Sequence, residues 1–310
     1  MKKFISLILA MILCTSALLC MPSCGEQTDF TVGICQLMEH ESLDKATNGF
    51  IDALTEELAK AGKTVKFDTQ VAGEATLCTT VVNTLTAKNV DLIMANATPA
   101  LLAAANATTN SKIPVLGTSV TDYNDTFKNN IPKNVSGTSD AVEFDKQANM
   151  MIESLNLASG DQVGVLYCSN ESNSLIQYEA VKKEFEANGI VVKAYTFSDT
   201  TELQAIVTNA ASESKAIYIP SDNTVADNDS VVGTICNEKK VPVYTSYGGA
   251  ICYASLAIDY YELGKETGKM AADILLGNKT PADIEIKTLT PSVSYNEDLC
   301  AQLGITINEK

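Results

Sequence analysis

The sequence contains one succession of segments twice, and this repeat restricts the fold more than any other feature. TVGICQLMEHES at 31–42 is matched by QVGVLYCSNES at 162–172, and VDLIMANATP at 90–99 by KAIYIPSDNT at 215–224. IPVLGTSVTD at 113–122 is matched by VPVYTSYGGA at 241–250, and helical segments end near Gly62 and Gly189. The four offsets lie between 125 and 131 residues, which is hard to attribute to chance. We therefore expect two domains built to one plan.

Within each half, strand-like and helix-like segments alternate. In the first half, apolar β-branched runs at 31–37, 64–70, 90–96 and 113–120 predict strands. Between the first two of these, Leu43, Phe50 and Leu58 recur at helical spacing, and Pro99 follows Thr98 where a further helix is expected to start. This alternation is typical of an α/β fold with a doubly wound parallel sheet in each domain.

The first residues have the composition of an export signal. Lys2 and Lys3 precede an apolar stretch over residues 4–21, and PSCG follows at 22–25. This end is similar to a bacterial lipobox, with Cys24 as the residue that would carry the lipid and with departures from the usual pattern at 21 and 22. We expect residues 1–23 to be a signal peptide and residues 24–29 a lipidated linker, either on the outer face of the cytoplasmic membrane or in the periplasm. Plain secretion and a membrane-spanning anchor are the alternatives.

Composition excludes several functions. The formal net charge of −16 opposes nucleic-acid binding, and no basic cluster offsets it. All 22 basic residues are lysine, so no arginine fork can capture a carboxylate or a phosphate. The six cysteines after residue 24 show no paired spacing, and His40 is the only histidine. We therefore expect free thiols, no metal site and no cofactor.

The repeat also predicts where a ligand binds. In an open parallel sheet, ligands bind beyond the carboxyl ends of the strands, and two facing domains would place two such edges around one cleft. Polar residues follow the predicted strands on both edges. They favour a zwitterionic amino acid, with its amine on carboxylates and its carboxylate on N–H groups near Thr98 and Ser119. The candidate residues are Glu39, His40, Thr98, Thr118, Ser119, Thr121 and Asp122 in the first half and Glu171, Asn173, Ser174, Asp222, Asn223, Thr224, Ser246, Tyr247 and Gly248 in the second.

Each candidate also has a purely structural interpretation. Thr98 and Asp222 are residue types that cap helices, and Glu39 with His40 would form a solvated loop in many proteins. Residues 247–249 would serve equally well as a turn. The candidates are favoured together by their position, since each follows a predicted strand at the same edge of a sheet.

Six stretches, taken in order, resemble a known family. They are GICQLMEHESLDKATNGFIDAL at 33–54, VDLIMANATPALLAAANAT at 90–108, IPVLGTSVTD at 113–122, NVSGTSD at 134–140, PSDNTV at 220–225 and SLAIDYYELGKETGKMAADILLG at 255–277. Together they resemble the substrate-binding lipoproteins of ABC transporters of the tryptophan/tyrosine type. The resemblance implies the type I periplasmic-binding-protein fold, with two Rossmann-like lobes joined by hinge crossovers. It also implies closure around an extracellular solute, delivery to an ABC permease and no catalysis.

The resemblance implies boundaries and further site residues as well. The first lobe would comprise residues 30–136 and 259–285, and the second residues 137–258 and 286–310. The crossovers would lie near 135–138 and 257–259, which would bring Asp259 close to the cleft floor, and a helix over 260–276 would return to the first lobe. Many relatives have an acidic pair in the last loop where this chain has Ser246 and Tyr247. Tyr247 would then stack on a flat ligand instead.

Two other classes of function remain open. An exported α/β enzyme is disfavoured, because the sequence lacks GxSxG, GxGxxG, GxxxxGK[ST] and HExxH motifs. A sensory domain would use the same fold. Among ligands, an aromatic or other small amino acid fits best. A sugar or a nucleoside is the alternative, since the chain has no Trp but Tyr123, Tyr167 and Tyr247 offer aromatic surfaces. We expect a monomer that contacts the membrane only through its lipid.

Overall fold

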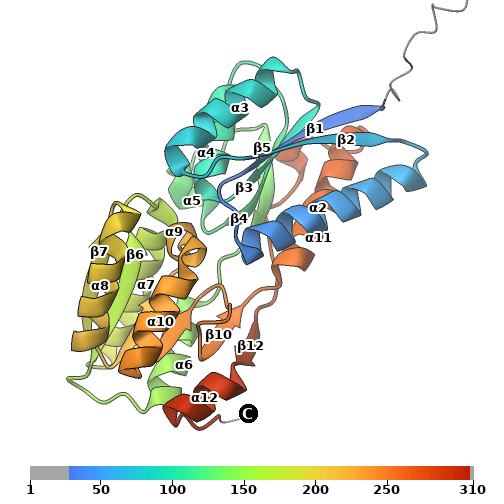
Figure 1. Ribbon diagram of the computed structural model, residues 1–310. Helices are drawn as coiled ribbons and strands as arrows, with labels where there is room; N and C mark the ends of the chain where they lie inside the picture. Colours follow the sequence, from blue (N-terminus) through green and yellow to red (C-terminus); the bar gives the residue numbers. More distant parts are fainter. Residues whose placement is uncertain (1–27, 308–310) are drawn as a thin grey trace, which may run out of the picture.

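The computed structural model describes residues 28–307. They form two α/β lobes, of which the first lies above the second in Figure 1. The first lobe is built on a six-stranded sheet of order β11-β5-β4-β3-β1-β2, in which every pair is parallel. Its strands are β1 (Phe30–Gln36), β2 (Val65–Val71), β3 (Leu92–Asn96), β4 (Val115–Val120), β5 (Val135–Ser139) and β11 (Lys287–Thr288).

The second lobe is built on a six-stranded sheet of order β12-β10-β9-β8-β6-β7. Five of its strands are parallel, and the edge strand β12 runs antiparallel to β10, which the sequence pattern did not predict. Its strands are β6 (Gln162–Cys168), β7 (Val191–Phe197), β8 (Ala216–Ile219), β9 (Val243–Thr245), β10 (Ala254–Ala257) and β12 (Ser292–Tyr295).

The predicted repeat is confirmed by the topology. The first five strands of each half take the same spatial order, β2-β1-β3-β4-β5 in one lobe and β7-β6-β8-β9-β10 in the other. The central strands read as apolar runs because helices cover both faces of each sheet, and β3 and β4 are buried along their whole length.

Helices flank both sheets. In the first lobe these are α2 (Glu41–Lys60), α3 (Cys78–Ala87), α4 (Thr98–Thr108), α5 (Tyr123–Thr126) and α11 (Tyr260–Leu275), with the 3-10 turns η1 (Ala75–Leu77) and η2 (Pro281–Asp283). In the second lobe they are α6 (Phe144–Leu155), α7 (Ser172–Ala187), α8 (Thr200–Glu213), α9 (Asn223–Asp227), α10 (Asp229–Lys239) and α12 (Glu297–Leu303).

The helix predicted over 260–276 returns to the first lobe as α11, where it packs along α2 (Figure 1). The approach is close, because a Cβ atom added at Gly264 would lie 1.9 Å from the carbonyl oxygen of Ala46. The apolar residues of α2 that recur at helical spacing, including Phe50, Leu54 and Leu58, are fully buried against the sheet and α11. This packing holds the amino-terminal ends of α2 and α11 at the junction of the lobes.

The chain crosses between the sheets after β5, after β10 and between β11 and β12. The predicted boundary after residue 136 falls inside β5, and the one after 285 falls two residues before β11. Since both strands pair in the first sheet, the strand pairing moves these two crossovers a few residues later, to about 140–143 and 289–291. The remaining boundaries stay predictions.

No helix among residues 28–307 combines the length and the apolar character that crossing a membrane requires. The six cysteines in this range are all buried and unpaired, and it contains no group of three His, Cys, Asp or Glu side chains placed to hold a metal ion. The signal peptide and Cys24 lie outside the described residues.

Candidate functional site

The carboxyl ends of the strands of both sheets meet at a small cavity between the lobes. The first lobe contributes residues that follow β1, β4 and β5, and the second lobe contributes residues that follow β6, β8 and β9. Hydrogen bonds between described residues of the two lobes cross the junction. His40 Nε2 lies 3.2 Å from Asn223 Oδ1, and Gln177 Nε2 donates to Thr121 Oγ1 at 3.0 Å. Burial lowers the pKa of His40, which favours the neutral ring. Asn223 donates from Nδ2 to Glu171, so its Oδ1 is left to accept from His40 Nε2.

Three buried polar atoms around this cavity have no hydrogen-bond partner among the described residues. They are Ser119 Oγ and Asp140 Oδ1 from the first lobe and Asn173 Oδ1 from the second. These three residues are at most 7% exposed. Buried polar groups are nearly always paired in proteins, so three orphans around one cavity indicate a site for a polar ligand. The cavity measures about 10 Å³, room for roughly one water-sized group.

Asp140 is the residue that the sequence analysis missed. It directly follows β5, in the NVSGTSD stretch that was interpreted only as a crossover. Its Oδ2 accepts a hydrogen bond from the Tyr260 hydroxyl at 3.0 Å, and burial raises its pKa to about 6. An acidic residue directly after a strand is the sequence signal that could have identified it as a site residue. Asp140 is therefore the acidic group best placed to meet a ligand cation.

Ser119 is turned into the cavity by an irregularity in β4. The register between β4 and β5 shifts between Gly117 and Val120, and Ser119 has a φ of 54°. A left-handed serine is uncommon and persists where the surrounding structure holds it, often at binding sites. Ser119 thus lies within β4, and the short helix α5 begins only at Tyr123.

Glu171 and Asp222, the predicted acidic residues of the second lobe, already have hydrogen-bond partners within that lobe. Glu171 accepts from the backbone N–H groups of Asn223 and Thr224 at 3.0 and 2.8 Å, and from the Thr224 hydroxyl at 2.8 Å. Asp222 caps α9 by accepting from Val225 N at 2.9 Å and also accepts from Ser174 Oγ at 2.7 Å. Burial, and then the charge of Glu171, raise the pKa of Asp222. These two carboxyl groups join the start of α7, which carries Asn173, to the start of α9, which carries Asn223.

Gln177 on α7 joins the loops of both lobes, and the sequence analysis missed it too. It donates to Thr121 and accepts from Ser221 N at 2.8 Å and from Ser246 Oγ at 3.0 Å. Gln177 lies inside a helix, whereas the candidates predicted from the sequence follow the ends of strands. Its long side chain carries the amide to the junction.

The other first-lobe candidates lie away from the small cavity. Thr118 Oγ1 bonds to Thr138 Oγ1 at 3.1 Å inside the lobe, Asp122 caps α5, and Glu39 is exposed. Thr98 was predicted to cap a helix. The structure instead begins α4 at Thr98, with Ala97 as the cap residue at a φ of 93°, and the buried Thr98 hydroxyl has no partner among the described residues.

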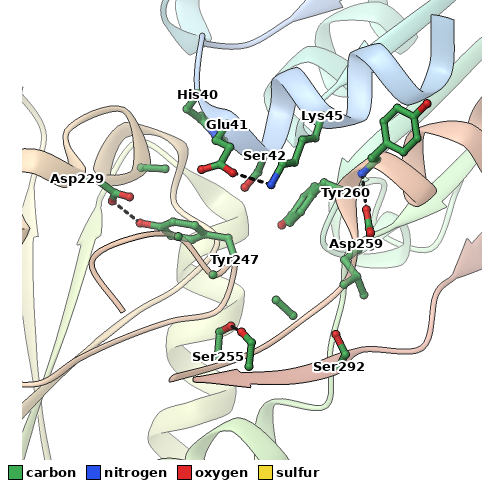
Figure 2. A pocket seen from close by; sticks show the side chains of 17 residues that line it. His40, Glu41, Ser42, Lys45, Asp229, Tyr247, Ser255, Asp259, Tyr260 and Ser292 are labelled. Carbon is green, nitrogen blue, oxygen red and sulfur yellow. Dashed lines mark hydrogen bonds and ion pairs between the residues drawn. The ribbon is translucent and has the colours of Figure 1, made fainter. Parts of the chain in front are cut away.

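A larger cavity of about 410 Å³ adjoins the small one (Figure 2). It falls within the 300–1,000 Å³ that is usual for small-molecule pockets. His40, Ser42, Tyr247 and Tyr260 line both cavities. Its remaining wall includes Gly248 and the crossover residue Asp259, which caps α11.

Tyr247 is held in place on the second-lobe side of the larger cavity. Its hydroxyl donates to Asp229 Oδ1 at 2.7 Å, and Figure 2 shows the ring across the cavity from Ser42. Burial raises the pKa of Asp229 to about 6. The ring thus presents an aromatic surface at the place where the two cavities meet.

The chain is similar to known proteins over most of its length. The family model of ABC transporter substrate binding proteins matches residues 31–310. A curated relative, the tyrosine-binding protein of Clostridioides difficile (strain R20291), is 33% identical over 98% of this chain and 93% of its own length.

Two solved structures are similar over most of the chain. An ABC domain from Streptococcus pneumonia in complex with L-Trp is 32% identical with a TM-score of 0.80, covering 89% of this chain and 96% of that one. The ligand-free, open structure of a substrate binding protein with adhesive properties from Clostridium difficile is also 32% identical, with a TM-score of 0.66 and coverage of 90% and 96%. At equal identity, the two scores indicate that the lobes described above lie nearer to the arrangement in the tryptophan complex than to the open one.

Proposed function

The chain belongs to the family of ABC transporter substrate-binding proteins, and on this premise we propose that its lobes close around a free aromatic amino acid. Proteins of this family are the extracytoplasmic solute-binding components of ABC transporters, and they work with a membrane permease. The choice of ligand rests on the site and on the two relatives, one a tyrosine-binding protein and the other bound to L-Trp.

One observation carries the proposal: the unpartnered buried atoms of Ser119, Asp140 and Asn173 surround a cavity that both lobes form. A ligand that satisfies all three must contact both lobes at once. Such a ligand binds the closed arrangement better than the open one and shifts the population towards it. This is the behaviour that a solute receptor requires.

Asp140 supplies the site for the ligand ammonium group. Its free oxygen faces a space of about 10 Å³, which suits a group the size of a water molecule. The aromatic ring then extends into the adjoining cavity of about 410 Å³, beside Tyr247 and Tyr260. Aromatic pairs contribute about 0.5–1.5 kcal/mol beyond the burial of their area, so the tyrosines favour an aromatic side chain.

A thermal-shift screen of the chain from Glu26 onward tests this function. We expect L-Tyr, L-Trp or L-Phe to raise the midpoint by an amount equivalent to about 2.7 kcal/mol at a hundred times the dissociation constant. Sugars and nucleosides should have no effect. Asp140→Asn should remove the shift, whereas Asp122→Asn, which preserves a helix cap outside the cavities, should retain it. A shift from sugars alone, or an intact shift in Asp140→Asn, would contradict the proposal.

We also propose that Cys24 carries the lipid that anchors the chain, as the lipobox-like segment indicates, and that the protein acts as a monomer. Metabolic labelling with a fatty-acid analogue tests the anchor, because Cys24→Ser should abolish the label and release the protein from membranes. Cys20→Ser is the matched control and should keep the label.

A further inference from the structure

The amino terminus of α2 opens onto the site and is not capped. This helix has 20 residues, and its cap residue, His40, makes no side-chain hydrogen bond to the first turn. The N–H groups of Glu41, Ser42 and Leu43 have no acceptor among the described residues. Unsatisfied N–H groups and the helix dipole together attract anions to such an end.

The same end faces the orphaned polar atoms. Ser42 and Leu43 line the small cavity with Ser119, Asp140 and Asn173, and Ser42 also lines the larger cavity. In Figure 2, Ser42 lies at the start of α2, between Tyr260 and the loop of Tyr247. The unpartnered side chains indicate a polar ligand independently of the helix. The amino terminus of α2 lies where that ligand would bind.

The cavities offer few cations to an anionic group. The lining includes His40, whose ring is neutral, and Lys45, which is paired with Glu41 at 2.6 Å and is 55% exposed at the rim. The chain has no arginine. A carboxylate in the site must therefore be held largely by neutral N–H and O–H donors.

We propose that the first turn of α2, with the Ser42 hydroxyl, binds the carboxylate of the ligand whose ammonium group is held by Asp140. This inference rests on the proposed function and assigns the two charged ends of the zwitterion to separate elements of the first lobe. The second lobe then closes over the ligand with Asn173 and Tyr247.

The start of α4 is the rival site that the sequence favoured. Its Thr98 hydroxyl is also unpartnered, but Pro99 has no N–H to donate, and Thr98 lines neither cavity. The carboxylate position expected near Thr98 is therefore moved to the start of α2, where Ser42 lines the same small cavity as Ser119.

The test compares L-tyrosine with tyramine, which lacks the carboxylate, by calorimetry on the chain from Glu26 onward. The wild type should bind tyrosine at least about tenfold more tightly than tyramine. Ser42→Asp places a negative charge in the first turn, where it favours the helix and excludes a second carboxylate. We expect it to keep its thermal midpoint, to lose tyrosine binding by at least about tenfold and to retain tyramine binding.

Two controls locate the effect. Thr201→Asp makes the same charge change at the second residue of α8, an exposed helix start outside both cavities, and should leave both ligands unaffected. Ser42→Ala removes one donor without adding charge and should weaken tyrosine several-fold but not tyramine. Thr98→Val should alter neither.

The outcomes separate this inference from the proposed function. If neither tyrosine nor another aromatic amino acid binds the wild type, the proposed function fails, and this site fails with it. If tyrosine binds but Ser42→Asp and Ser42→Ala bind it as tightly as the wild type does, only the α2 site is overturned. Loss of the preference for tyrosine over tyramine in Thr98→Val, with both Ser42 variants unchanged, would instead assign the carboxylate to α4.

Discussion

Asp140 is a buried carboxyl group with one unsatisfied oxygen, which destabilises the unliganded protein. It is buried, one oxygen accepts from Tyr260, and the other has no partner among the described residues. Leaving a buried acceptor unsatisfied destabilises a protein by about 1–3 kcal/mol, and more for a charged group. In the proposed complex, the ligand ammonium removes this penalty. Part of the binding free energy would therefore come from satisfying the Asp140 oxygen that has no partner in the unliganded site.

The position of Asp140 makes ligand affinity depend on pH. Burial raises its pKa to about 6, so the unliganded carboxyl takes up a proton as the pH falls through that value. Protons then compete with the ligand ammonium. We expect the association constant to be constant above pH 7 and to fall below pH 6, approaching about tenfold per pH unit.

Calorimetric titrations between pH 4.5 and 8 would measure this dependence. Asp229, with a pKa also near 6, contacts Tyr247 at the other cavity and is the main competing source. Asp229→Asn should therefore keep the fall in affinity. An affinity independent of pH down to 5 would show that Asp140 does not bind the ammonium group.

At the scale of elements, the sequence predicted the positions of helices and strands well. It predicted poorly which side chains reach the site. The alternation of strands and helices in both halves and the start of α4 near Thr98 follow from periodicity and from the repeat, whereas the return of α11 was implied by the family resemblance. The strand-end rule locates backbone, however, so it selected Asp222, whose oxygens already accept from Val225 N and from Ser174 Oγ of α7. It missed Gln177, whose long side chain reaches the junction from within α7. Only the packed structure shows which polar atoms lack partners.

The contact between α2 and α11 yields a stability prediction for one element pair. A Cβ at Gly264 would lie 1.9 Å from Ala46 O, and backbone on both sides prevents easy relief. We expect Gly264→Ala to destabilise the protein by about 2–3 kcal/mol despite the better helix propensity of alanine. Urea unfolding curves would measure the loss. Gly268→Ala, with its nearest contact at 2.7 Å from Phe50 O, should lose less, and equal midpoints for Gly264→Ala and the wild type would refute the packing argument.

At the scale of the whole molecule, few polar contacts hold the lobes together across the site. His40 to Asn223 and Gln177 to Thr121 are the bonds that cross between the strand-end loops in the described residues. A hydrogen bond contributes about 0.5–1.5 kcal/mol, which is small enough for the unliganded lobes to open. This agrees with a receptor whose closure is decided by its ligand rather than by the protein alone.

Removing one of these contacts should shift that equilibrium without preventing closure. His40→Phe keeps an aromatic ring of similar size but has no N–H to donate to Asn223. The loss of about 0.5–1.5 kcal/mol should raise the ratio of open to closed molecules by roughly two- to tenfold. Small-angle scattering should therefore give a larger radius of gyration for the unliganded variant than for the wild type. Saturating ligand supplies new contacts between the lobes, so it should return both proteins to the same compact value. Equal radii without ligand would mean that the bond from His40 to Asn223 does not hold the lobes together, and the crossovers alone would then set their resting arrangement.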